Sequence, residues 1–101
     1  MKQVKILADM ELKRANKIKP LFADEHHGWA VMLEEAQECE EDMQQINSEL
    51  EKLWNAIRSN KKYDVRTIRL IAMELACEAI QVAAMAQKYT DSLEANNGNN
   101  S

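Results

Sequence analysis

Residues Ala72–Ala86, AMELACEAIQVAAMA, decide the fold because they describe a helix that is apolar on more than one side. Apolar residues recur there at alternating steps of three and four, which is the period of one helical face. This row consists of Val65, Ile68, Ala72, Leu75, Ala79, Val82, Ala86 and Tyr89. A second row beside it contains Met73, Cys77, Ile80 and Ala84. A helix with two apolar rows needs two neighbours.

The preceding stretch supplies one neighbour. Apolar residues from Trp29 to Ile57 show the same alternating steps and predict a helix of about 30 residues. This row consists of Trp29, Met32, Ala36, Cys39, Met43, Ile46, Leu50, Leu53 and Ile57. Asp24 and Asp64 are placed to act as N-caps of the two long helices. The polar residues between the helices predict a short turn and therefore an antiparallel hairpin.

With 101 residues, two glycines and one proline, the chain has the length of one domain and the composition of a helical one. Residues 4–18 predict a short helix with a thin apolar face. We expect an all-α domain over residues 1–92, made of the long helical hairpin and this short N-terminal helix, and a disordered polar tail over residues 93–101. A second copy of the chain is the simplest source of the missing neighbour, so we expect a homo-oligomer, dimer or tetramer, that completes a four-helix bundle.

Charge and hydropathy exclude several classes of partner. The net charge is −4, with 17 acidic and 13 basic side chains and no continuous basic stripe, which argues against binding to duplex nucleic acid. No apolar run reaches the length of about 18 residues that a membrane helix needs. The N-terminus has no signal-peptide pattern, so we expect a soluble cytoplasmic protein. In that compartment, Cys39 and Cys77 are expected to be reduced.

Carboxylates interrupt the apolar helix. Glu74, Glu78 and Gln81 share one face, and a carboxylate without a partner is costly to remove from water. Glu35 and Glu38 lie one turn apart on the flank of the preceding helix, with Asp42 on the same side. If these groups converge, a divalent cation must offset their repulsion. Oxygen ligands without a His or Cys cluster favour Mg²⁺ first and Mn²⁺ next.

Each of these features also has an ordinary structural explanation. An acidic run such as residues 34–42 is typical of a solvated helix face. Glu74 and Glu78 could extend to the rim of the bundle and pair there with a nearby arginine or lysine. Trp29 and Trp54 could stack on a base, but their positions on and beside the apolar row favour packing in the core. The Glu-x-x-His motif of ferritin-like metal sites is absent.

The acidic pattern resembles that of the MazG-like all-α nucleotide pyrophosphohydrolases, in particular small phage-type members, over residues 22–90. Their pattern is EExxE followed by ExxD on a later helix. Glu34, Glu35 and Glu38 match the first motif, and Glu74 matches the first residue of the second. Cys77 stands where the family has Asp, and a thiol is a poor Mg²⁺ ligand. Glu78, about 40° from Glu74 around the helix, could supply the missing oxygen.

The resemblance implies a hydrolase that converts an NTP or dNTP to the monophosphate and pyrophosphate with the help of Mg²⁺ or Mn²⁺. The metal ligands would be Glu35, Glu38, Glu74 and Glu78, and Glu35 or Glu38 would also hold the attacking water. The candidate phosphate contacts are Lys61, Lys62, Arg66 and Arg69, and the alternative for this basic cluster is an ordinary solvated turn. The alternative is a non-catalytic helical-bundle interaction or adaptor protein of phage or bacterial origin, in which the acidic residues serve only solubility.

Overall fold

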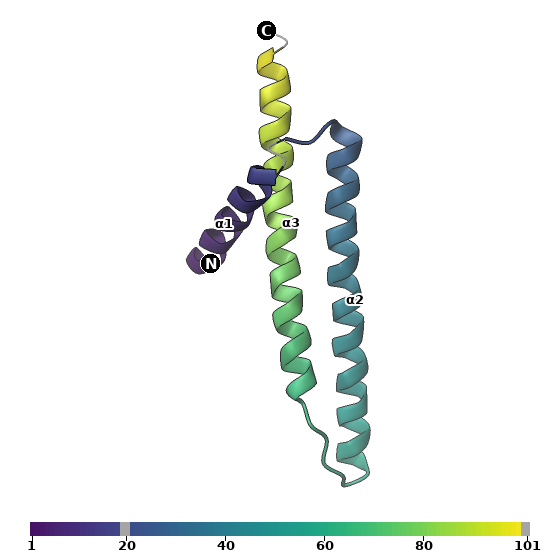
Figure 1. Ribbon diagram of the computed structural model, residues 1–101. Helices are drawn as coiled ribbons and strands as arrows, with labels where there is room; N and C mark the ends of the chain where they lie inside the picture. The colour runs from purple at the N-terminus through teal and green to yellow at the C-terminus, as the bar shows by residue number, and fades with distance from the viewer. Residues whose placement is uncertain (19–20, 100–101) are drawn as a thin grey trace.

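The computed structural model describes residues 1–18 and 21–99, the last four of these by their backbone alone, and all regular elements in this part of the chain are α-helices. They are α1 (Lys2–Ile18), α2 (Glu25–Arg58) and α3 (Arg66–Asn99). Figure 1 shows α2 and α3 side by side as an antiparallel hairpin, while α1 crosses α3. The prediction of an all-helical fold with a long hairpin and a short N-terminal helix is confirmed. Residues 93–99 continue α3 as helix, and residues 100 and 101 of the predicted tail lie outside the described residues.

The predicted caps explain where the long helices begin. Asp24 is the N-cap of α2, and its side chain accepts a hydrogen bond from the backbone N–H of His27 at 2.7 Å. Asp64 lies one residue before the predicted N-cap position, because α3 begins at Arg66 and Val65 is the N-cap residue; the Asp64 side chain nevertheless accepts the backbone N–H of Arg66 at 2.9 Å. Both bonds satisfy N–H groups that have no partner within the helix. In the connection, Asn60 adopts a positive φ of 58°, a conformation that Asn tolerates better than most residues.

The contact rows between α2 and α3 differ from the predicted rows by a rotation of about 60° around each helix axis, at roughly 100° per residue. Ala36, Met43 and Leu50 are exposed, and the acidic residues one position earlier are half-buried in their place. The observed row of α2 contains Met32, Glu35, Cys39, Asp42, Ile46, Glu49, Leu53 and Ala56. That of α3 contains Ile68, Ile71, Leu75, Glu78, Val82, Met85, Tyr89 and Ser92. Five of the nine residues in the predicted α2 row and four of the eight in the predicted α3 row were therefore wrong.

A gain in buried apolar area explains the rotation of α3. The rotation places Ile71 and Met85 in the row that contacts α2, where the predicted row has Ala72 and Ala86. Isoleucine and methionine bury more apolar surface than alanine, and burial stabilises roughly in proportion to that area. The rotation also brings Glu78 into the contact row. The same choice of packing therefore sets the position of the acidic side chains.

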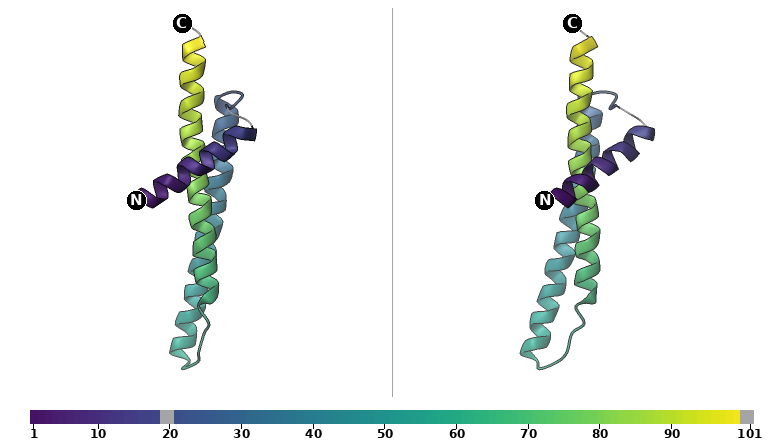
Figure 2. Two further views of the ribbon diagram at one scale, coloured as in Figure 1. Left: turned by 60° about the vertical axis from the view of Figure 1, so that its left-hand side comes forward. Right: turned by 90° about the vertical axis from the view of Figure 1, so that its left-hand side faces the viewer.

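A small core lies where the three helices meet. Its buried apolar members are Phe22, Ala84 and Met85. The hydroxyl of Ser92, also buried, accepts the backbone N–H of Phe22 at 3.0 Å and donates to the carbonyl of Lys88 at 2.8 Å. These bonds attach the segment before α2 to α3. The core positions α1 and the start of α2, whereas the far end of the hairpin is held by the two long helices alone (Figure 2).

Much apolar surface remains exposed. The exposed fractions of Trp29 and Trp54 are 61% and 57%, so the prediction that both pack in the core is wrong for the single chain. Met43, Leu50 and Ile57 of the predicted row of α2 are exposed as well. The molecule measures 68 × 26 × 21 Å, which is elongated for its length. Within the described residues, no helix combines the length and apolar character required to cross a lipid bilayer.

Candidate metal centre

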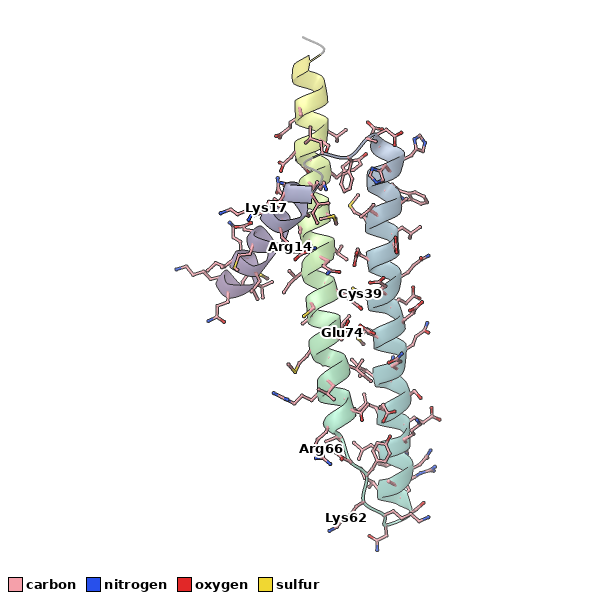
Figure 3. All side chains as sticks on the ribbon, viewed as in Figure 1. Arg14, Lys17, Cys39, Lys62, Arg66 and Glu74 are labelled. Carbon is pink, nitrogen blue, oxygen red and sulfur yellow. The ribbon has the colours of Figure 1, made fainter. Side chains whose placement is uncertain are left out.

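Carboxylates from both long helices meet in the middle of the hairpin. Glu35, Glu38 and Asp42 lie on the side of α2 that faces α3, and Glu78 lies in the contact row of α3. All four side chains are half-buried. Figure 3 shows Cys39 and Glu74 at similar heights on the two helices, which locates the group halfway along the hairpin. We call Glu35, Glu38, Asp42 and Glu78 the acidic cluster.

The members of the acidic cluster perturb one another. The pKa of Glu78 is raised to about 7, first by a hydrogen bond with Asp42, then by burial and by the negative charges of Asp42, Glu38 and Glu74. Burial also raises the pKa of Glu35, and the charge of Glu38 adds to this effect. The thiol of Cys39 has a raised pKa because it is buried beside the same carboxylates. The cluster therefore has a stronger affinity for positive charge than ordinary surface carboxylates.

Three oxygen atoms of the acidic cluster are buried and have no hydrogen-bond donor when the carboxyl groups are ionised, so the Glu78–Asp42 hydrogen bond requires a shared proton. The three atoms are Oε2 of Glu35, Oδ2 of Asp42 and Oε2 of Glu78. An unpartnered buried carboxylate oxygen costs free energy, and a hard cation offsets that cost. The donor atoms therefore suit Mg²⁺ or Mn²⁺ in kind. Among the described residues, however, no group of three or more His, Cys, Asp or Glu side chains is arranged so that it could hold a metal ion, so the acidic cluster as it stands is not a formed metal site.

The short helix contributes a further carboxylate. Glu11 of α1 lies close enough to Glu35 for its negative charge to raise the Glu35 pKa. Glu11 in turn accepts a hydrogen bond from Nε of Arg14 at 3.0 Å, and its own pKa is lowered by this bond. Arg14 therefore pairs with the α1 carboxylate whose charge acts on Glu35. Sequence reasoning missed Glu11 and Arg14 because the crossing of α1 over α3 leaves no periodic signal.

The predicted site residues fall into two groups. The structure brings Glu35 and Glu38 together with Glu78, while Glu74 is exposed and acts on Glu78 through its charge. Asp42, which the sequence placed on the same side as Glu35, belongs to the cluster as well. The four predicted phosphate contacts lie toward the loop end of the hairpin, where Figure 3 shows Lys62 and Arg66. They are Lys61, Lys62, Arg66 and Arg69, all exposed.

Arg66 also has a local partner. Its guanidinium pairs with Asp64 at 2.6 Å, and this bond lowers the pKa of Asp64. Twelve helical positions separate Arg66 from Glu78, which corresponds to roughly 18 Å along the axis at about 1.5 Å per residue. The basic residues and the acidic cluster are therefore separate features of the single chain.

No protein-family model, no curated protein and no solved structure matches this sequence.

Proposed function

We propose that the chain is a Mg²⁺-dependent nucleoside triphosphate pyrophosphohydrolase that cleaves between the α- and β-phosphates of an NTP or dNTP. The observation that carries the proposal is the convergence of carboxylates from α2 and α3, three of which hold a buried oxygen without a hydrogen-bond donor when they are ionised. The MazG-like acidic pattern supports the same activity. This activity would operate in the cytoplasm, where nucleotides are available.

The carboxylates would have two roles, cation binding and activation of the attacking water. Glu38, Asp42 and Glu78 would hold the cation, with Glu74 joining from the exposed side of α3. Bound Mg²⁺ supplies charge neutralisation for the phosphates and polarises a phosphoryl oxygen. Glu35 would orient the attacking water and accept its proton, a role that suits a carboxylate whose pKa is raised by burial. Glu78 rather than Cys77 would provide the oxygen at the end of the second motif, because the Cys77 side chain is exposed outside the cluster.

A second copy of the chain would complete the bundle. The chain exposes 7720 Å² of accessible surface. A compact monomer of 11.6 kDa exposes roughly 5,800 Å². The excess is larger than the ~800 Å² that each partner buries in a standard interface. The exposed apolar residues of α2, which include Trp29, Met43, Leu50 and Ile57, would supply the contact. In the homo-oligomer, the basic residues of one chain could approach the acidic cluster of another.

The test is the release of pyrophosphate from each of the four dNTPs and NTPs with Mg²⁺ or Mn²⁺. We expect activity with at least one nucleotide and a loss of about 10²-fold or more in Glu38→Gln, because a lost ligand or positioned carboxylate typically costs that much. Glu41→Gln is the matched control, since Glu41 is an exposed glutamate one turn away on the same helix. No pyrophosphate from any nucleotide with either metal would rule out the activity.

A non-catalytic interaction protein is the second candidate, and the exposed apolar residues of α2 favour it. Trp29, Leu50 and Trp54 are exposed on a helix that is otherwise strongly charged, a surface suited to a helical partner. Under this alternative, the acidic cluster would remain protonated or hydrated without a specific cation. Indifference of the melting temperature to Mg²⁺, together with oligomerisation, would favour the interaction protein over the enzyme.

A further inference from the structure

An open groove lies between α1 and α3 beside the acidic cluster. It has a volume of about 520 Å³, within the range of roughly 300–1,000 Å³ typical of small-molecule sites. The residues that line it are Leu7, Met10, Glu11, Arg14, Cys77, Ile80 and Gln81. Leucine, methionine and isoleucine provide apolar walls, and the polar groups are an amide, a thiol and one ion pair. This combination of apolar walls with a few polar groups is typical of ligand sites.

The groove adjoins the acidic cluster on both of its walls. On α3, Glu74 lies about 60° from Cys77 and about 40° from Glu78, on opposite sides, at roughly 100° per residue. Glu74 therefore lies between the groove residue Cys77 and the cluster residue Glu78, less than a quarter turn of the helix from each. On α1, Glu11 lines the groove and also raises the pKa of Glu35 through its charge. A molecule that extends from the groove past Glu74 or Glu11 would approach the carboxylates of the acidic cluster.

Arg14 gives the groove a cation that can change partner. Its side chain is 61% exposed, whereas that of Glu11 is 19% exposed. The guanidinium is therefore free to move, and a surface ion pair of this kind contributes little to stability. A phosphate offers a guanidinium the same two-pronged hydrogen bonding as a carboxylate, with more negative charge. Among the cations that the structure describes, Arg14 lines the groove, and Lys17 of the same helix does not.

We propose that this groove binds the nucleoside part of the nucleotide. The base lies between Leu7, Met10 and Ile80, and its polar edge forms a hydrogen bond with the Gln81 amide. Arg14 contacts a phosphate. The proposal rests on the proposed function and assigns its substrate site. A base fits because it has apolar faces and a polar edge, and its attached phosphates are directed toward the cation-binding carboxylates. A helix of a second copy would cover the apolar walls of the groove, but it would give Arg14 no phosphate and the Gln81 amide no base edge to contact.

Cys77 provides a direct readout because it lines the groove and is exposed. The full-length protein is treated with N-ethylmaleimide, and modification of Cys77 and of Cys39 is quantified separately by peptide mass spectrometry. The probes are the four dNTPs as α,β-methylene analogues, which resist cleavage, with Mg²⁺. Inorganic tripolyphosphate with Mg²⁺ is the control without a base. We expect at least one analogue to slow Cys77 modification about tenfold at roughly ten times its Kd, by mass action, and tripolyphosphate at the same concentration to slow it much less.

Two variants test the role of Arg14. Arg14→Gln is expected to raise the analogue concentration that gives half-maximal protection by about tenfold, which corresponds to about 1.4 kcal/mol and is close to the lower end for a hydrogen bond to a charged group. Lys17→Gln, a cation removed from the same helix outside the groove, is expected to leave protection unchanged. Equal effects of the two variants would show that the charge of α1 acts at a distance and would overturn the contact.

The remaining outcomes separate this proposal from the proposed function. If pyrophosphate is released in a Glu38-dependent reaction while no analogue protects Cys77, the activity stands and the groove proposal fails. If tripolyphosphate protects Cys77 as well as an analogue does, phosphate alone covers the groove and the base assignment fails. If Cys77 is protected without nucleotide, and more so at higher protein concentration, a second copy occupies the groove and the proposal fails. Absence of both pyrophosphate release and protection contradicts both proposals.

Discussion

Glu78→Gln is the substitution whose effect on stability depends most clearly on pH. The pKa of Glu78 rises from 4.5 to about 7 on folding, chiefly through its hydrogen bond with Asp42. Between these two values the folded state binds more protons than the unfolded state. The free energy of unfolding therefore falls as the pH rises through this window and levels off above it. Glutamine cannot ionise, so Glu78→Gln removes this part of the pH dependence.

The size of the effect follows from the pKa difference. A difference of about 2.5 corresponds to at most about 3.4 kcal/mol at 1.36 kcal/mol per unit. Because Glu78 is only half-buried, solvent screening reduces the effect to on the order of 1–2 kcal/mol. In a domain of this length, 1 kcal/mol corresponds to about 4–8 °C in Tm. We therefore expect the wild-type Tm to fall by roughly 4–16 °C between pH 5 and pH 8 in the absence of divalent cations.

The assay is thermal unfolding followed by circular dichroism in EDTA at both pH values. Glu78→Gln should lose most of the decrease and should exceed the wild-type Tm at pH 8. Glu41→Gln removes the same charge from an exposed position and measures the background from the net charge of −4. A wild-type Tm that stays constant or rises from pH 5 to pH 8, or a decrease of equal size in both variants, would refute the electrostatic reasoning.

Three further predictions concern the fold and its assembly. Gly28→Ala should lower the free energy of unfolding by about 1–2 kcal/mol in urea titrations. The new Cβ would lie 2.5 Å from Cδ2 of Tyr89, and the cost of this overpacking exceeds the gain in helix propensity. An unchanged unfolding midpoint would contradict the close contact. Ser92→Ala should cost about 1–3 kcal/mol and accelerate hydrogen exchange at the Phe22 amide, which loses its acceptor. Leu50→Glu should shift sedimentation toward the monomer, whereas Gln44→Glu on the exposed polar side of α2 should not; a wild type that sediments as a monomer at all concentrations would exclude the homo-oligomer.

Local features of the fold could be predicted from the sequence because their causes are local. Asp24 caps α2 through a bond to a residue three positions later, and Asp64 bonds to the N–H of a residue two positions later. The alternating steps of three and four revealed two long helices, since a helical face repeats with that period whatever packs against it. These signals need no knowledge of the partner helix. The helix types and the hairpin therefore agree with the sequence analysis.

The rotation of the contact rows was not predictable from the period alone. Adjacent rows of one helix share the same alternating steps, and the packing against the other helices decides between them. Glu35 and Glu78 lie in the observed rows, where the apolar pattern had favoured Ala36 and Ala79. For the candidate site, the sequence placed Glu35, Glu38 and Glu78 on neighbouring faces. It could not place Glu11, because only the crossing of α1 brings it near Glu35.

The central claim is that the acidic cluster binds a divalent cation, and a titration of the full-length protein with Mn²⁺, followed by electron paramagnetic resonance of the free ion, tests it most directly. We predict saturable Mn²⁺ binding near neutral pH, and Mg²⁺ should displace the bound Mn²⁺. Glu38→Gln and Glu78→Gln should each weaken the binding by about 10–100-fold. Glu41→Gln should leave it unchanged. Binding of equal strength in all four proteins, or no saturable binding in the wild type, would contradict the account.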